Sequence, residues 1–317
     1  MNVWEFILDK ISATQQVMLL YVLDSEGSSP GRQGFKMAVA ADGEFYGTIG
    51  GGVMEHKLVE KAKAMLLQNE KAVLLMRQHH DKEHASNQSG MICSGSQLNV
   101  FIPVTIGDKL TINTILSTEK KSIQISPTGI RLIDEPAAGL QYKTDTDWLY
   151  SEPLNQQPVI HIIGGGHVGL ALSELMQFLG FYIKLYDDRP ELNTIAGNAY
   201  AHEKHIVNYE SIGNHFIDVE SDYAVIMTIG YRTDKQVLKQ LIGKPFFYLG
   251  LLGSDHKINM LLHELETEGH SLQSLKNIHT PIGINIFSKT TKEIAVSIAA
   301  EIIREKNKEL PTGRNYQ

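Results

Sequence analysis

Residues 158–191 read PVIHIIGGGHVGLALSELMQFLGFYIKLYDDRPE, and this stretch decides the fold of the C-terminal half of the chain. The apolar run 159–163 predicts a buried parallel strand, which leads directly into the sequence GGGHVG. Apolar residues at helical spacing follow over 170–179, and a second apolar run over 182–186 ends in two aspartates. A strand, G-x-G-x-x-G, a helix, a strand and an acid about twenty residues on are the elements of a dinucleotide-binding fingerprint.

Each glycine of this fingerprint has a physical task. We expect Gly164 to permit the tight turn, Gly166 to let the backbone approach a pyrophosphate, and Gly169 to let the helix pack on the strand. The helix N-terminus, with His167 in the same loop, presents N–H groups to an anion. Asp187 would accept hydrogen bonds from the ribose hydroxyls of NAD, and its charge would disfavour a 2′-phosphate. The alternative is a Rossmann-type core without a nucleotide, because the glycines also serve the turn and the packing.

Length and composition limit the remaining possibilities. A chain of 317 residues is long for one hydrophobic core, so two domains are expected. Hydrophobic residues make up 42% and charged residues 21%, and the net charge of −7 argues against a nucleic-acid partner. The sequence shows no signal-peptide pattern and no apolar run of membrane-spanning length, so we expect a cytoplasmic protein without a membrane partner. One cysteine excludes an intramolecular disulfide.

The N-terminal half mixes helical and strand patterns. Its predicted elements are a helix over 3–12, a strand over 17–23, a hairpin of 36–40 and 44–49, a helix over 53–69, and strands over 73–76 and 98–104. This order predicts an α/β domain with a mixed sheet over residues 1–109.

The rest of the chain divides into three parts. Residues 110–157 carry short alternating pieces, which predict a hairpin-rich connecting segment. Residues 158–306 alternate strands with helices, which predicts a Rossmann-like doubly wound parallel sheet, and residues 307–317 form a polar tail. After the first β-α-β unit we expect strands over 223–229 and 246–252 and helices over 235–242, 255–269 and 290–306.

Two further glycine loops follow strands in the N-terminal half and are candidate anion sites. Consecutive glycines before a helix offer backbone N–H groups to a phosphate or another anionic ligand. The alternative is a pair of tight turns in which only glycine tolerates the dihedral angles. The candidate residues are Gly27, Ser28, Ser29, Gly50, Gly51 and Gly52.

Cys93 and a group of histidines are the candidates for metal or sulfur chemistry. A sole thiol in a loop could contact a soft metal such as molybdenum or accept sulfur, although a small apolar role is the commoner one for a single cysteine. Residues 79–84, HHDKEH, contain three histidines and two acids, but their polar surroundings favour a solvated loop over a metal site.

Three loops of the C-terminal half follow strand ends or precede the last helix. They cover residues 231–234, 253–257 and 279–283, the last beginning with His279. Ligands of open parallel sheets bind at the carboxyl ends of the strands, so we expect these loops to converge on the fingerprint.

Taken in order, these loops resemble the XdhC/CoxI family of accessory factors for xanthine dehydrogenase and related molybdenum hydroxylases. GSSPGRQGFKMAVAADGEFYGTIGGGVMEHKLVEKA at 27–62 and GMICSGSQLNVFIPV at 90–104 are similar to the N-terminal domain of that family. The fingerprint, YLGLLGSDHK at 248–257 and IHTPIGINIFSKTTKEIAVSIAAEII at 278–303 are similar to its C-terminal Rossmann domain. The resemblance covers nearly the whole chain.

The resemblance implies a maturation protein without turnover of its own. Members of the family bind the molybdenum cofactor, a molybdopterin, and shield it while a cysteine desulfurase installs its terminal sulfur ligand. They then pass the cofactor to the apo-hydroxylase. The family motifs fall on residues 27–34, 50–55, 93–96, 164–169 and 279–283.

The chain departs from the family pattern at three places. Val53 stands where many members have cysteine after the triple glycine, and Ser94 stands in a motif that is commonly Cys-Gly-Gly. Residues 229–232, IGYR, replace a segment that often contains histidines. A sulfur relay between two cysteines of one chain is therefore impossible, and any thiol chemistry depends on Cys93.

A second hypothesis belongs to a different class. It is an NAD(H)-dependent oxidoreductase, with Asp187 on the ribose and His167 or His279 as acid or base. No catalytic lysine, tyrosine or histidine with a convincing partner is evident in the sequence, so no catalytic residue is assigned. A homodimer is expected by family likeness.

Overall fold

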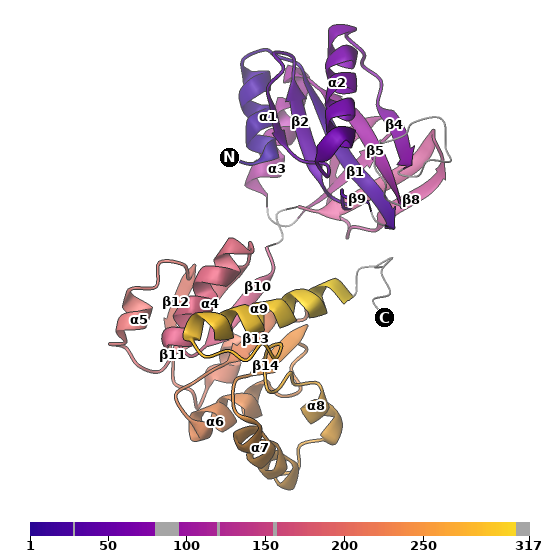
Figure 1. Ribbon diagram of the computed structural model, residues 1–317. Helices are drawn as coiled ribbons and strands as arrows, with labels where there is room; N and C mark the ends of the chain where they lie inside the picture. Colours follow the sequence, from indigo (N-terminus) through magenta and orange to yellow (C-terminus); the bar gives the residue numbers. More distant parts are fainter. Residues whose placement is uncertain (28, 80–94, 119–120, 155–156, 309–317) are drawn as a thin grey trace. The chain divides into compact units, whose positions relative to one another are not determined.

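The computed structural model describes residues 1–27, 29–79, 95–118, 121–154 and 157–308 (Figure 1). The chain folds into two compact units, the first over Met1–Gln156 and the second over Gln157–Thr312. Each unit has its own sheets and its own hydrophobic clusters. In the described ranges, no helix combines the length and the apolar character needed to cross a bilayer.

The first unit alternates helices with antiparallel strands. In chain order its described elements are α1 (Val3–Ser12), β1 (Val17–Gly27), β2 (Lys36–Ala40), β3 (Phe45–Gly47), α2 (Gly52–Leu67), β4 (Leu74–His79), β5 (Gly95–Val104), the 3₁₀ turn η1 (Ile106–Asp108), α3 (Lys109–Ser117), β6 (Ser122–Ser126), β7 (Gly129–Ile133), β8 (Gly139–Thr144) and β9 (Asp147–Pro153).

Two sheets form the first unit over its described residues. A five-stranded sheet has the order β3-β2-β1-β5-β4, and a four-stranded sheet has the order β7-β6-β9-β8. The expectation of a mixed sheet is wrong, because every pair of neighbours in the five-stranded sheet is antiparallel. Hairpins such as β2–β3 need only a short turn, whereas a parallel pair needs a long crossover connection.

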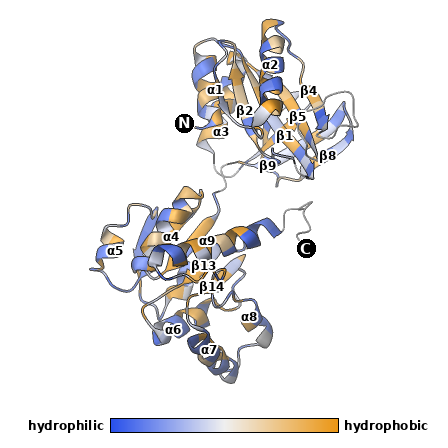
Figure 2. Cartoon of the chain, viewed as in Figure 1, coloured by the Kyte–Doolittle hydropathy of each residue, from blue (hydrophilic) through white to orange (hydrophobic). Residues whose placement is uncertain are grey.

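Strand β1 is buried on both faces, and this explains why its sequence is apolar at successive positions instead of alternating. Leu19 and Tyr21 face the cluster that α1, α3 and the four-stranded sheet cover. Met18 and Leu20 face the opposite side and pack under α2. A strand buried on both faces needs apolar residues at every position, and Figure 2 shows β1 and β5 as mainly apolar ribbons.

The second unit is a β-α-β fold. In chain order its described elements are β10 (Val159–Ile163), α4 (His167–Phe178), β11 (Tyr182–Asp187), α5 (Asn193–Ala196), β12 (Glu203–Ile206), the 3₁₀ turn η2 (Ile212–His215), β13 (Tyr223–Ile226), α6 (Tyr231–Leu241), β14 (Tyr248–Leu251), α7 (Asp255–Thr267), α8 (Leu272–Lys276) and α9 (Thr291–Lys308).

The sheet of this unit confirms the predicted doubly wound topology. Over the described residues its order is β12-β11-β10-β13-β14, and all four pairings are parallel. Helices α4 and α9 cover one face of the sheet, and α6 and α7 cover the other (Figure 1). The strand order reverses between β10 and β13, and ligands of such sheets bind at that switch point, beside the carboxyl ends of the strands.

Candidate functional site

The two glycine loops of the first unit lie against each other, backbone to backbone. A Cβ on Gly50 would lie 2.5 Å from the Gly31 nitrogen, and a Cβ on Gly31 would clash with the Ile49 carbonyl oxygen. Gly50 also has a φ of 128°, a backbone conformation that L side chains rarely adopt. The structure therefore brings together the loop after β1 and the loop after β3, which are separate in sequence.

The side chain of Gln97, in β5, forms hydrogen bonds with both loops. The hydroxyl of Ser29 donates to Gln97 Oε1 over 2.9 Å, and Gln97 Nε2 donates to the Ile49 carbonyl oxygen over 3.0 Å. The same amide donates to Asn99 Oδ1 over 2.7 Å, and both side chains are fully buried. Gln97 is not among the residues predicted from the sequence. The signal was available, because two amides alternate with apolar residues in a buried strand.

Glu55 fills part of the turn that was expected to bind an anion. One carboxylate oxygen accepts hydrogen bonds from the Thr48 hydroxyl at 2.6 Å, the Ile49 amide at 2.9 Å and the Gly51 amide at 3.0 Å. A carboxylate is a suitable occupant for a concave group of backbone N–H donors. Two amides of this turn are therefore paired with the protein itself.

The start of α2 is the part of this turn that stays open. The helix begins at Gly52, and its N-cap residue Gly51, whose own amide bonds to Glu55, has no side chain to cap the amides that follow. A Cβ on Gly51 would meet no atom within 4 Å, and the following Val53 is 56% exposed. The first backbone N–H groups of an α-helix have no intrahelical acceptor, so this end suits an anionic group.

Several sequence candidates lie outside the described residues. These are Ser28, Cys93 with Ser94, and the histidine-rich segment after His79. Ser96, at the end of the cysteine motif, is described, and it donates to Glu26 over 3.4 Å. Within the described ranges no group of three or more histidine, cysteine, aspartate or glutamate side chains is placed to hold a metal ion.

A partly buried carboxylate joins the two sheets of the first unit. Glu152 of β9 accepts hydrogen bonds from the phenols of Tyr21 and Tyr150 and pairs with Lys36, whose Nζ lies 3.0 Å away. Burial, and then the charge of Glu152, raises the pKa of both tyrosines, so both phenols remain donors. A Cβ on Gly34 would lie 3.0 Å from Glu152 Oε2, so this cluster supports the end of the first loop.

The fingerprint of the second unit has the geometry that its glycines predict. A Cβ on Gly164, where φ is 121°, would clash with the Met227 carbonyl oxygen of the neighbouring strand end. A Cβ on Gly169 would clash with the Gly164 oxygen, so the helix packs on the strand as expected. A Cβ on Gly166 would meet nothing within 4 Å, which leaves space over the start of α4.

Asp187, the acid at the end of β11, is hydrogen-bonded to other groups of the same chain. Its carboxylate is fully buried and accepts from the Gly165 amide over 2.7 Å. Arg189 donates to it three times: from the backbone amide at 3.0 Å, from Nε at 2.8 Å and from a terminal guanidinium nitrogen at 2.8 Å. Arg189, which forms the ion pair with this carboxylate, lies two residues further along the chain and was not among the predicted residues.

A buried ion pair joins the next two strand ends. Asp234 of α6 is fully buried and accepts from the Thr228 amide at 3.0 Å and the Thr228 hydroxyl at 2.6 Å. Lys257 of α7 donates to the other oxygen of the same carboxylate. The loops 231–234 and 253–257 therefore meet each other. Asp234 lies in the first turn of α6 and bonds back to Thr228, just before the helix, so α6 begins at Tyr231 and not at the expected residue 235.

The two candidate histidines have different surroundings. His167 is exposed as the first residue of α4, directly after Gly166. The His279 ring stacks on Tyr248 with 4.3 Å between ring centroids, and burial lowers the pKa of this histidine. Tyr248 in turn donates to Glu301 of α9 over 2.8 Å. The described contacts of His279 are therefore with β14 and the α9 face, not with the glycine loop.

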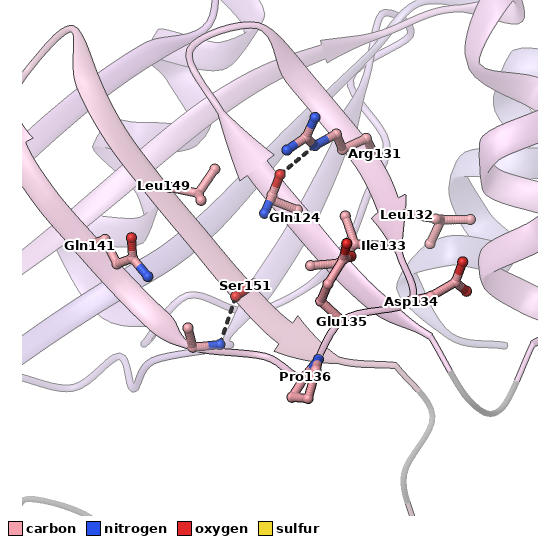
Figure 3. Close-up of a pocket in the computed structure, with 11 residues that line it drawn as sticks. Gln124, Arg131, Leu132, Ile133, Asp134, Glu135, Pro136, Gln141, Leu149 and Ser151 are labelled. Atoms are coloured by element: carbon pink, nitrogen blue, oxygen red, sulfur yellow. Dashed lines mark hydrogen bonds between the residues drawn. The ribbon is translucent and has the colours of Figure 1, made fainter.

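A hollow of about 470 Å³ lies on the outer face of the four-stranded sheet (Figure 3). Arg131 donates to Gln124 at its upper end, and Ser151 accepts from the Ala138 amide at its lower end. None of the described residues that the sequence analysis singled out as candidates lines it. Its lining is Gln124, Arg131, Leu132, Ile133, Asp134, Glu135, Pro136, Ala138, Gln141, Leu149 and Ser151.

These features define the class of protein: an antiparallel α/β unit with paired glycine loops, followed by a Rossmann unit. Residues 11–77 match the model of the XdhC and CoxI family, and residues 160–302 match that of the XdhC Rossmann domain. The chain belongs to the XdhC/CoxI family.

Curated relatives and a solved structure show the same relationship. The chain is 28% identical over 289 residues to the uncharacterized protein YqeB of Escherichia coli, and 26% identical over 169 residues to a probable xanthine dehydrogenase subunit of Bacillus subtilis. These matches cover 90% and 53% of this chain but only 43% and 49% of those relatives, so the chain spans less than half of their length.

Two comparisons extend over nearly the whole chain. The molybdenum cofactor insertion chaperone PaoD of Escherichia coli is 21% identical over 302 residues, covering 95% of this chain and 87% of PaoD. A crystal structure described as a xanthine dehydrogenase from Bacillus halodurans superposes with a TM-score of 0.72 at 20% identity. It covers 100% of this chain and 99% of that one. At this identity the superposition shows the shared fold.

Proposed function

We propose that this chain is an accessory factor that binds the molybdenum cofactor and supports its sulfuration and insertion into a xanthine dehydrogenase-type molybdenum hydroxylase. Membership of the XdhC/CoxI family supports this proposal. So do relatives named as a molybdenum cofactor insertion chaperone and as a probable xanthine dehydrogenase subunit.

The observation that carries the proposal is the meeting of the family motifs in the first unit. The loops after β1 and β3 pack on each other, and Gln97, just after the cysteine motif, bonds to both. The open start of α2 lies in this same group of loops. A molybdopterin carries a phosphate, and uncapped N–H groups at a helix start are suited to that group.

The chain's own groups would hold and shield the cofactor rather than transform it. Cys93 is the only thiol of the chain, so a contact to molybdenum or to sulfur from this protein depends on it. A two-thiol relay is not available, so a cysteine desulfurase partner would supply the sulfur while this chain holds the cofactor. We assign no catalytic residue, and no turnover is expected.

The first test measures molybdenum per chain after anaerobic incubation with free molybdenum cofactor and desalting. Near-stoichiometric metal in the wild type that is lost in Cys93→Ala supports a carrier with the cofactor at the thiol. Retention in the variant supports a carrier that uses the glycine loops. Metal in neither protein contradicts the carrier proposal.

A second pair of variants tests the start of α2. Val53→Glu places a carboxylate on an exposed position in the first turn, where it should repel a bound phosphate by roughly 1–3 kcal/mol at intermediate dielectric. The affinity for the cofactor should fall by about fivefold to 150-fold, which lowers the molybdenum retained after desalting. Leu67→Glu, which is 86% exposed at the other end of the same helix, is the matched control and should retain the metal. Equal retention in the two variants contradicts this placement of the phosphate.

A further inference from the structure

The Asp187 carboxylate has no acceptor capacity left for a ligand. A carboxylate offers about four lone-pair sites. Oδ1 accepts from the Arg189 backbone amide and Nε, and Oδ2 accepts from the Gly165 amide and a guanidinium nitrogen. An acid at this point of a Rossmann fold recognises NAD through the hydroxyls of its ribose. In this chain all four donors to the Asp187 carboxylate come from the protein itself.

We propose that Arg189 determines the ligand specificity of the Rossmann crevice by saturating Asp187, so that the crevice excludes nicotinamide dinucleotides. This inference goes beyond the proposed function, because it concerns the second unit and requires no molybdenum cofactor. It also removes the specific acceptor on which an NAD(H)-dependent oxidoreductase would depend.

A ribose cannot readily displace the arginine. The guanidinium makes two parallel charge-assisted hydrogen bonds, which are about twice as strong as the neutral bonds that a diol would offer. The Asp187 side chain is fully buried, so its charge needs the nearby cation. Burial opposes ionisation of Asp187, but the hydrogen bonds from Arg189 and Gly165 outweigh it and hold its pKa below the ordinary value.

The same arrangement disfavours a 2′-phosphate. Nε and one terminal nitrogen of Arg189 are committed to Asp187, and the Asp188 carboxylate lies 3.9 Å from Nε. Asp188 is 41% exposed, so the three side chains together present a net negative charge beside the crevice. NADP(H) therefore gains no cationic site from this arginine.

The test titrates NADH into the full-length protein and follows the nucleotide fluorescence. The wild type should show no saturable binding up to ~1 mM, a standard free energy near −4 kcal/mol. Arg189→Ala removes the two side-chain donors and frees two acceptor positions on Asp187, so it should bind NADH at least about tenfold more tightly. The gain should be absent for the reduced dinucleotide with a 2′-deoxyadenosine moiety (2′-deoxy-NADH), because that probe lacks the diol but keeps the fluorescence. A purely structural role for Arg189 would not separate the two probes.

Arg304→Ala is the matched control, because Arg304 is a half-exposed arginine of the same unit whose ion pairs lie on α9. It should bind like the wild type. Circular dichroism checks that each variant is folded, and Arg189→Gln carries the same expectation if Arg189→Ala is unstable. Saturable binding of NADH or NADPH by the wild type overturns the proposal. So does a folded Arg189 variant without gain, or an equal gain for the 2′-deoxy probe. Molybdenum retention is measured separately, so a failure of this proposal can be told apart from a failure of the carrier proposal.

Discussion

Removal of the Gln97 amide should loosen both glycine loops of the first unit. Three hydrogen bonds disappear, to Ser29, Ile49 and Asn99, each worth about 1 kcal/mol net. The partners left behind are buried polar groups, and an unsatisfied group of this kind costs about 1–3 kcal/mol. We therefore expect Gln97→Met, which keeps the volume, to lower the free energy of unfolding of the first unit by about 3–5 kcal/mol. Gln97→Ala should cost more, because it adds a cavity.

Tryptophan fluorescence during urea unfolding measures this effect selectively. Both tryptophans of the chain, Trp4 and Trp148, are buried in the first unit, so the signal reports on that unit alone. Gln141→Ala, an exposed glutamine on β8, is the control and should stay within about 0.5 kcal/mol of the wild type. Molybdenum retention should fall in the Gln97 variants even in the absence of urea. An unfolding midpoint of Gln97→Met equal to that of the wild type would refute the reasoning.

Three further predictions concern the second unit and are followed by circular dichroism. Asp234→Ala should destabilise it by about 1–3 kcal/mol, because the Thr228 amide and hydroxyl lose a buried acceptor and the partly exposed Lys257 loses its ion-pair partner. Gly169→Ala should lower the melting temperature strongly, since its Cβ would clash with a backbone oxygen, whereas Gly166→Ala should change it by no more than about 2 °C. Burial lowers the pKa of His279 from 6.5, so the unfolded state binds the proton first as the pH falls. The contribution of this histidine to the free energy of unfolding is therefore complete above about pH 6.5 and is lost as the pH falls below that value. The free energy of unfolding should differ less between about pH 7.5 and pH 5.5 in His279→Phe than in the wild type.

The sequence predicts the fold of the second unit well because its strands are buried on both faces. Apolar runs bounded by glycines leave few alternatives to a parallel sheet. Strand β12 was missed, since EKHI is an edge strand with polar side chains and pairs only with β11. Helix α3 was missed for a related reason, because in nine residues it buries only Ile112 and Ile115. Short elements that bury little carry a weak periodic signal.

Strand direction in the first unit could not be read from the residues. The apolar run of β1 is compatible with parallel or antiparallel neighbours, because both kinds of sheet can bury a central strand. The choice is made by its neighbours: β2 pairs with it along Val17–Tyr21, and β5 pairs on the other side. The connection between β4 and β5 lies outside the described residues, and long-range pairing of this kind leaves no local pattern in the sequence.

Candidate site residues were predictable by position but not by partner. A glycine motif specifies a group of backbone N–H donors, and it does not specify what those donors bind. In the first unit Glu55 follows Gly51 by four residues, a spacing at which a carboxylate can reach back to the amides before its own helix. In the second unit the partner of Gly165 is Asp187, twenty-two residues away, and only the β11 pairing brings it there.

This self-pairing limits which ligands the two glycine loops can bind. Each loop can offer a ligand only those backbone donors that the protein does not already bond, and over the described residues the open positions lie at a helix start, at Gly52–Val53 and at Gly166. Such donors suit a phosphate and do not read a sugar. The one side chain that would read a ribose, Asp187, is taken up by Arg189. A phosphorylated pterin needs no acceptor for a diol, so it meets these conditions. NAD needs an acceptor for its ribose diol, and in this chain that acceptor is already bonded to an arginine.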